Sequence, residues 1–384
     1  MIMSWPDVRA RRMARHGLGS AGCDGVAAAA RAMCGAHAQI MSAAELSVGI
    51  RCPGTSRSDV RAALWTNQTL VKTYGPRGTV HLLPAEDLPW WLAALSAVPH
   101  QVAVPDTMAM SKDQTEAVIT AIGDAVADAG DRGLTIAELS EQVPARVGSW
   151  AGDLVMPAFQ QMWPRWRQSL GAAAHRGAVI FGPDRGRQVT YRSPADLLSV
   201  RPAPSESKAL AWLLRGYLHS YGPARPRDFA KWLAGPVHWA ERLFGKLASE
   251  FTEVEFADAG AYVVRRDTKM SADRADSVRL LPYFDSFVVG SHPRELLFPG
   301  KAAERALSPS GQAGNYPTLL INGEVAGVWH ARRSGSTIAI TVEPLRGLTT
   351  SQRAALDEEA DRIGFISEAK PSLTIGTVSV GGHA

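Results

Sequence analysis

Hydrophobic and polar positions follow a helix, helix, helix, hairpin order in the second quarter of the chain. Residues 112–130 carry a helical pattern that stops at Gly130, and Thr135 and Glu138 have the capping-box spacing that starts a second, shorter helix. A longer helical stretch is predicted around residues 153–174, and the β-prone runs AVIFG and QVTYRS follow it on either side of PDRGR. This order is typical of a winged helix with a basic hairpin tip.

The same order recurs in two other parts of the chain. From residue 205, three helical segments precede the strands TEVEF and AYVVRR, which flank the turn ADAG. Near the start, VAAAARAM, IMSAAELSVGI and SDVRAALW lead into a hairpin, TLVKTYG and TVHLLP, whose central Pro76, Arg77 and Gly78 suit a turn. Three units of similar plan indicate an internal structural repeat, although no sequence identity between the copies is obvious.

After Asp267 the pattern changes to short β-prone segments interrupted by Gly, Pro and Asn. Asn322-Gly323 and Ser334-Gly335 lie between alternating apolar runs, and each signals a hairpin. A small antiparallel sheet or barrel is predicted here, followed by the helix-like TSQRAALDEEADRIGFIS and a Gly-rich tail. The predicted α+β architecture is three tandem winged-helix domains, residues 1–110, 111–204 and 205–268, and a C-terminal antiparallel β-barrel, residues 269–384.

The composition indicates a globular protein. The 384 residues are 46% hydrophobic and 20% charged, which is enough for about two to four compact units. No apolar run is long enough to span a bilayer, and the N-terminus lacks the apolar core of a secretory signal, so a cytoplasmic location is expected. Cys23, Cys34 and Cys52 lack the paired spacings of a zinc site and are interpreted as reduced packing thiols. No metal and no cofactor are expected.

Basic residues gather beside predicted turns, which bears on the kind of partner. A net charge of +4 and a pI near 9.0 fit DNA, RNA or simply good solubility. The clusters are Arg9, Arg11, Arg12 and Arg15; Arg185 and Arg187; Arg265 and Arg266; and Arg332 and Arg333. Each cluster alone can be a solvated face, and a single winged helix can bind protein. Three winged helices with basic wings favour nucleic acid.

Generic enzyme signatures are absent from the sequence, which contains no GxSxG, phosphate-binding loop, HExxH or Rossmann glycine fingerprint. One local feature stands out, the segment GAHAQ at residues 35–39 between two apolar helical stretches. Because Gly35 is a plausible helix stop, we predict that the chain breaks near Cys34 and restarts near Ile40.

This break matters for the two polar side chains within it, His37 and Gln39. In an unbroken helix, positions i and i+2 diverge by about 200 degrees, whereas at a junction they can converge on one target. The structural alternative is a junction histidine with satisfied contacts beside a capping glutamine.

Several segments resemble the AlkZ family of winged-helix DNA glycosylases. They are LVKTYGPRGTVHLLPAEDL, LLPYFDSFVVGSH, INGEVAGVWH and the His37-Ala38-Gln39 junction, and the likeness runs through nearly the whole chain. The resemblance implies three winged helices and a β-barrel arranged as a C around double-stranded DNA, in a nucleoid-associated protein. It also implies excision of N7-alkylated purines, including bulky guanine adducts and interstrand crosslinks, in repair or in self-resistance to a genotoxic natural product.

The family's catalytic motif is a polar residue, an apolar residue and then Gln or Asp, and it falls here on His37, Ala38 and Gln39. Most members have Gln first, so water activation by two glutamines does not carry over unchanged. In this interpretation Gln39 orients a water towards the anomeric carbon, and neutral His37 shares that water and accepts a proton. Protonated His37 would repel the developing sugar cation, so the rate is predicted to fall between about pH 7.5 and about 5.5.

Phosphate contacts, which would supply most of the binding free energy, are predicted on the hairpins. The candidates are Lys72, Arg77, Arg185, Arg187, Arg332 and Arg333. Taken singly, each is explained equally well as a solvent-exposed turn charge.

Other polar and aromatic residues are interpreted as structural. His81 in the strand TVHLLP is expected to pack under the wing rather than face DNA, and Asp285 is expected to be structural. Trp150, Trp163 and Trp166 have partly helical spacing, which favours core packing over a base-stacking platform.

The main alternative function is a non-catalytic winged-helix protein, either a regulator or a drug-sequestering binder, which the absence of a strong catalytic group favours. A nuclease is disfavoured because no carboxylate cluster suited to two metals is apparent. We expect a monomer without membrane contact, since one set of modules that encircles DNA needs no partner.

Overall fold

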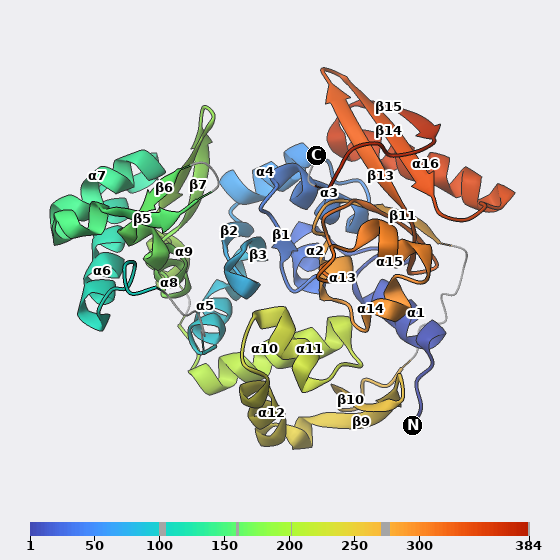
Figure 1. Cartoon of the computed structure of the whole chain (residues 1–384), viewed down its shortest axis with the longest axis horizontal. Helices are drawn as coiled ribbons and strands as arrows, with labels where there is room; N and C mark the ends of the chain where they lie inside the picture. Colours follow the sequence, from blue (N-terminus) through green and yellow to red (C-terminus); the bar gives the residue numbers. More distant parts are fainter. Residues whose placement is uncertain (100–104, 159–160, 201, 270–276, 383–384) are drawn as a thin grey trace.

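The computed structural model describes residues 1–99, 105–158, 161–200, 202–269 and 277–382. Figure 1 shows four groups of elements, which follow one another along the chain from blue through green and yellow to red. Helix α1 (Trp5–Arg15) precedes the first group and packs beside the third and fourth. Its buried Arg12 donates hydrogen bonds to the carbonyl oxygens of His292 (2.7 Å) and Pro223 (3.0 Å). The N-terminal basic cluster is therefore partly used inside the molecule.

The first group has a short strand between its first and second helices. Its elements are α2 (Val26–Ala32), β1 (Ala36–His37), α3 (Met41–Arg51), α4 (Arg57–Trp65), β2 (Leu70–Tyr74), the 3₁₀ turn Pro76–Gly78 and β3 (Val80–Pro84), followed by the 3₁₀ turn Ala85–Asp87 and α5 (Leu88–Ser96). The strands form an antiparallel sheet in the order β1-β3-β2. The segment between the helices is thereby fixed to the hairpin.

The second group repeats this order, with a sheet in the order β4-β8-β7. Its elements are α6 (Lys112–Asp128), the 3₁₀ turn Gly130–Arg132, β4 (Leu134–Thr135), α7 (Ile136–Val147), the 3₁₀ turn Ser149–Gly152, β5 (Leu154–Pro157), β6 (Met162–Pro164), the 3₁₀ turn Arg165–Ser169, α8 (Leu170–His175), β7 (Ile180–Arg185), β8 (Gln188–Arg192) and α9 (Ala195–Ser199).

The long helix predicted around residues 153–174 is wrong. Residues 154–157 and 162–164 pair as the β5–β6 hairpin, and helix α8 begins only at Leu170; residues 159–160 lie outside the described part of the chain. Pro157 and Pro164 explain the difference, because a proline inside a helix lacks a hydrogen-bond donor and clashes with the preceding turn.

The third group comprises α10 (Glu206–Tyr221), α11 (Pro226–Leu233), α12 (Val237–Lys246), the 3₁₀ turn Ala248–Glu250, β9 (Phe251–Phe256) and β10 (Ala259–Val264). A single antiparallel bridge between Ala224 and Tyr262 replaces the short strand of the other two groups. Helices followed by a hairpin therefore recur three times in the observed element order; the residue boundaries predicted between the units stay a prediction.

The fourth group is a five-stranded sheet with helices around it. Its elements are β11 (Val278–Leu281), α13 (Ser286–Gly290), α14 (Arg294–Leu297), α15 (Lys301–Ala306), β12 (Thr318–Ile321), β13 (Glu324–Ser334), β14 (Thr337–Pro344), α16 (Thr350–Ser367) and β15 (Lys370–Ile375). The order is β11-β12-β13-β14-β15. Both predicted hairpins are confirmed, at Asn322-Gly323 with φ of 54° and 79° and at Ser334-Gly335.

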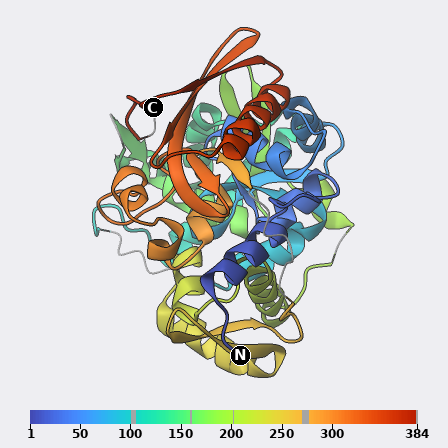
Figure 2. The ribbon, with the colours of Figure 1, turned by 90° about the vertical axis from the view of Figure 1, so that its right-hand side faces the viewer.

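The predicted closed, antiparallel barrel also needs correction. The sheet stays open between β11 and β15 among the described strands, and β15 runs parallel to β14. Leu356, Ala360 and Ile363 of α16 are buried against the sheet, so a helix covers the apolar face that a barrel would close upon itself. Figure 2 shows this helix lying alongside the strands.

One continuous apolar core joins the first and second groups, and it includes Leu82, Ile122 and Trp166, all fully buried. The core position predicted for Trp166 is confirmed, while Trp150 and Trp163 are partly buried. Among the residues that the structure describes, no helix has both the length and the apolar composition needed to cross a membrane.

Candidate active site

The break between α2 and α3 lies where the sequence places it. Helix α2 ends at Ala32, and Cys34 and Gly35 follow with φ of 51° and 97°. Helix α3 begins after an extended Ile40. A Cβ on Gly35 would lie 2.8 Å from Leu83 Cδ2, so both the backbone angle and the packing require glycine.

The extended backbone of this junction sorts its side chains onto two sides. Ala36 and Ala38 are 0% and 1% exposed and belong to the apolar core. His37 and Gln39 both line one cavity on the other side. Alternate residues of an extended chain share a face, so a strand explains why an apolar residue separates the two polar ones.

The cavity has a volume of about 360 Å³ and is built from three of the four groups. The first group supplies the junction and the hairpin turn, the third supplies α11, and the fourth supplies α13, α14 and the segment after α15. The lining residues are His37, Gln39, Arg77, Thr79, Lys231, Trp232, Phe284, Val289, His292, Arg294, Ser310, Gly311, Gln312 and Ala313. Elements far apart in sequence thus meet at the predicted catalytic pair.

His37 is 9% exposed and is held between two rings. Its ring centroid lies 4.8 Å from that of Phe284 and 5.2 Å from that of His81. Burial, with a smaller contribution from the charge of Arg77, lowers the pKa of His37 to about 4. His37 is therefore neutral at physiological pH, and its Nδ1 has no hydrogen-bond partner among the described residues. Gln39, in contrast, is exposed.

His81 is structural, as the sequence analysis expects. It is 2% exposed, and its Nδ1 donates to the carbonyl oxygen of Thr79 (2.8 Å). Burial lowers its pKa well below the ordinary histidine value. A neutral His81 supports the edge of the His37 ring.

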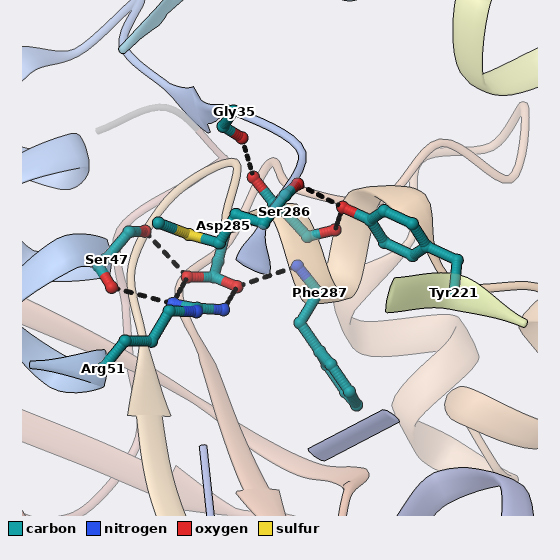
Figure 3. A network of polar contacts seen from close by, with 8 residues as sticks. Gly35, Ser47, Arg51, Tyr221, Asp285, Ser286 and Phe287 are labelled. Atoms are coloured by element: carbon teal, nitrogen blue, oxygen red, sulfur yellow. Dashed lines mark hydrogen bonds and ion pairs between the residues drawn. The ribbon is translucent and has the colours of Figure 1, made fainter. Parts of the chain in front are cut away.

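Hydrogen bonds from elements remote in sequence hold the backbone of the junction between α2 and α3 (Figure 3). Ser286 Oγ donates to the carbonyl oxygen of Gly35 (2.8 Å). The Tyr221 hydroxyl donates to the carbonyl oxygens of Met33 (2.9 Å) and Ser286 (3.1 Å). Because Tyr221 belongs to α10 and Ser286 to α13, the position of His37 depends on the docking of the third and fourth groups.

Asp285 anchors this network and is structural, as predicted. Arg51 of α3 donates through Nη2 to Asp285 Oδ1 (2.7 Å) and through Nη1 to Oδ2 (2.8 Å), and Ser47 Oγ donates to Oδ2 (2.7 Å). The backbone amide of Phe287 donates to Oδ1 (3.0 Å), so the same carboxylate caps α13. Both charged side chains are 0% exposed, and the pair fixes α13 beside the cavity.

The first hairpin does not present its two basic candidates on a free tip. Lys72 is partly buried on β2, with its ammonium 5.1 Å from the ring centroid of Phe181 on β7. Arg77 donates to the carbonyl oxygen of Trp232 (2.7 Å), so the tip packs on α11 and Arg77 faces the cavity. The alternative interpretation as solvent-exposed turn charges is therefore wrong for both residues, and their contact with DNA stays a prediction.

The later hairpins are more exposed. Arg187 is exposed at the β7–β8 turn, and Arg332 and Arg333 are exposed at the end of β13. Arg185 forms an ion pair with Glu138. Figure 1 shows the ends of these two hairpins pointing to the same side of the molecule. DNA binding by these arginines stays a prediction.

Sequence reasoning missed three cavity residues, Lys231, His292 and Arg294. Lys231 belongs to an ordinary amphipathic helix, and Arg294 follows a Pro in a loop-rich region. No local pattern marks them, since only the packing of α11 and α14 against the first group brings them to His37.

Comparisons with known proteins give one consistent result. The model of the family described as "DNA glycosylase AlkZ-like" matches residues 30–364. A curated protein of Streptomyces sahachiroi, "Interstrand DNA cross-link repair glycosylase", is 28% identical over 358 residues, covering 86% of this chain and 88% of that protein. The solved structure of Streptomyces sahachiroi DNA glycosylase AlkZ has the same fold, with a TM-score of 0.79 at 23% identity, covering 98% of this chain and 100% of the other.

Proposed function

Because this chain belongs to the AlkZ-like DNA glycosylase family, we propose that it hydrolyses the N-glycosidic bond of bulky N7-alkylguanine adducts or crosslinks in double-stranded DNA. It would be monofunctional, releasing the base and leaving an intact strand with an abasic site. The name of the curated relative, an interstrand cross-link repair glycosylase, supports this substrate class. The biological role would be repair, or self-resistance to a genotoxic natural product.

The observation that carries the proposal is the presence of His37 and Gln39 on one wall of the same cavity. Alkylation at N7 makes guanine cationic and already a good leaving group. The enzyme then needs mainly to place a water and to tolerate an oxocarbenium-like sugar, and no strong general acid is required. Holding the water in line is a positioning effect that can supply several kcal/mol, at the extreme about 7 to 11.

The two side chains divide this task by their surroundings. The exposed Gln39 amide is available to hydrogen-bond a water at the cavity wall. His37 is neutral because burial lowers its pKa to about 4, so it adds no positive charge beside the sugar while the oxocarbenium-like state forms. It takes up the proton of the water only as that water attacks the anomeric carbon.

We further propose that the three helical groups with hairpins are winged-helix modules, spanning about the predicted residues 1–110, 111–204 and 205–268, that hold duplex DNA in a C-shaped arrangement as a monomer. The exposed Arg187 and Arg332 at the hairpin ends are the leading backbone contacts on this surface. Affinity would then depend strongly on salt, because bound cations are released from DNA when the protein binds.

The test is base release from two duplexes, one with N7-methylguanine and one with a bulky N7 adduct, followed by heating in alkali. The wild-type protein should produce strand breaks at the lesion only after alkali. His37→Ala should lower the rate about 100-fold to 10,000-fold, as loss of a proton acceptor does, and Gln39→Ala should lower it as well.

Matched controls are His238→Ala and Gln161→Ala, which change exposed residues outside the cavity and should leave the rate unchanged. A band shift without breakage would identify a non-catalytic binder. Full activity of the double variant His37→Ala/Gln39→Ala would refute the assignment of the site.

A further inference from the structure

Positive charge collects in the cavity beside His37. Arg77 comes from the hairpin turn, Lys231 from α11 and Arg294 from α14. Within the described chain, none of the residues that line this cavity is Asp or Glu. Three cationic side chains therefore line one cavity to which the described residues add no carboxylate.

The two arginines contact carbonyl oxygens rather than acids. Arg77 donates to Trp232, and Arg294 donates to the carbonyl oxygens of Val288, Val289 and Ser291, the last at 2.8 Å. The structure shows no ion pair for Arg77, Lys231 or Arg294 with any residue it describes. Carbonyl oxygens orient a guanidinium but cancel none of its net charge, so the cavity stays cationic.

Neighbouring titratable groups respond to this charge. Burial, together with the charges of Arg294 and Lys231, lowers the pKa of His292 to about 2. Burial also lowers the pKa of Arg294 to about 10, with Arg77 and Arg12 adding to the effect. Like charges held together in this way are destabilising in the free protein, and a bound anion would relieve the repulsion.

We propose that this cavity is a phosphate subsite, in which Arg77, Lys231 and Arg294 bind one backbone phosphate of the lesion strand next to the alkylated nucleotide. The proposal rests on the proposed glycosylase function. Arginine forks match the geometry of phosphate oxygens, and Lys231 adds a mobile point charge at the exposed rim.

The subsite would serve the reaction in two ways. A phosphate held here fixes the attached sugar against the wall that carries His37 and Gln39. Its negative charge also offsets the cationic lining, which would otherwise raise the energy of an oxocarbenium-like sugar. The three cationic side chains would therefore favour the reaction only when a DNA phosphate is bound in the cavity.

The first test measures salt dependence of duplex binding by Lys231→Gln and by the control Lys246→Gln, which changes an exposed lysine of α12 outside the cavity. For Lys231→Gln, loss of one of the three cations at the phosphate should reduce the slope of log K against log salt by up to about 0.9 and weaken binding by up to about eightfold at roughly 0.1 M salt. A slope equal to that of the wild type would overturn the proposal.

The second test replaces single phosphates near the lesion by neutral methylphosphonates. One position should weaken binding by wild type and Lys246→Gln more than binding by Lys231→Gln, because in Lys231→Gln only the two arginines remain to contact that phosphate. If every position that weakens wild-type binding weakens Lys231→Gln equally, the proposal fails. Duplex binding is also measured with added inorganic phosphate at constant ionic strength. If inorganic phosphate competes with the duplex but no single methylphosphonate position matters, the cavity is a site for free anions, and the proposal is overturned.

These measurements report binding and are independent of base release. A positional phosphate effect in a protein that releases no base would leave the subsite standing and remove the glycosylase proposal. Normal base release without a positional effect would leave the glycosylase proposal standing and remove the phosphate subsite.

Discussion

At the scale of single residues, His37 combines burial with access to the cavity. It is buried enough for its pKa to fall to about 4, yet it lines the cavity. Histidine is useful near neutrality because small changes of environment move its charge. Here the environment removes the charge, which suits a group next to a sugar that becomes positive.

The first prediction concerns pH and reverses the expectation from the sequence. The active, neutral form of His37 is populated above its lowered pKa, so kcat/KM should stay flat from about pH 7.5 to about 5.5, since this parameter reports the free enzyme. It should fall only as the pH approaches about 4. The measurement is the rate of base release under subsaturating DNA, corrected for spontaneous release. A decline already between neutrality and about pH 5.5 would contradict the neutral state of His37.

A second prediction separates positioning from stability. Ser286→Ala removes the hydrogen bond to the Gly35 carbonyl, while Ser47→Ala removes one to Asp285 in the same network. Both should lower stability by about 1 kcal/mol. Only Ser286→Ala should lower kcat, by roughly 10-fold with KM unchanged, because small displacements of catalytic groups are costly. Ser286→Thr should restore kcat. Equal kcat losses in the two alanine variants would count against a positioning role for Ser286.

At the scale of elements, the sequence predicts features that depend on local backbone angles and does not predict those that depend on remote packing. Gly35 predicts the end of α2, and Asn322-Gly323 predicts a hairpin, because both structures need backbone angles that few residues adopt. The β5–β6 hairpin is hard to predict because its apolar residues also fit a helix, and only Pro157 and Pro164 argue against one. The pairing of β15 with β14 depends on how α16 packs, which no local pattern encodes.

The candidate site divides in the same way. His37 and Gln39 are two positions apart in sequence and could be found at the junction, whereas Arg77, Lys231 and Arg294 belong to three separate elements. Their meeting is a property of tertiary packing, and a single sequence carries no pattern for it.

A third prediction tests the junction as an element. Gly25 and Gly35 both have positive φ, 89° and 97°, so alanine at either costs about 1–3 kcal/mol of backbone strain. Only at Gly35 would the new Cβ also meet a neighbour, Leu83 Cδ2 at 2.8 Å; at Gly25 nothing lies within 4 Å. Gly35→Ala should therefore lose base release as well as stability, while Gly25→Ala should keep full activity. Unfolding by urea and the base-release assay measure both, and identical activities would contradict the proposed geometry.

At the scale of the whole molecule, buried arginines link groups of elements by ion pairs and hydrogen bonds. Arg11 pairs with Asp267 (2.9 Å), Arg12 binds carbonyl oxygens of two loops, and Arg51 pairs with Asp285 across more than two hundred residues of sequence. Clusters that suggest nucleic-acid binding in the sequence are thus partly structural. The net charge of +4 consequently says little about the charge that faces DNA.

The last prediction follows from the Arg51–Asp285 pair. Asp285→Ala leaves a guanidinium buried without its carboxylate and removes the cap of α13, so the free energy of unfolding should fall by about 3–5 kcal/mol. Base release should fall too, because α13 and Phe284 hold the cavity wall. Replacing both partners, Arg51→Met with Asp285→Leu, should cost less than the single change, since no unpaired charge remains.

The matched control is the exposed pair Arg176–Glu116, whose side chains are 46% and 45% exposed. Glu116→Ala should cost far less stability than Asp285→Ala, because solvent screens such a pair. Urea unfolding compares the variants directly. If Asp285→Ala proved as stable as Glu116→Ala, the buried pair would not be what holds the fourth group against α3, and the position of the cavity wall would need another explanation.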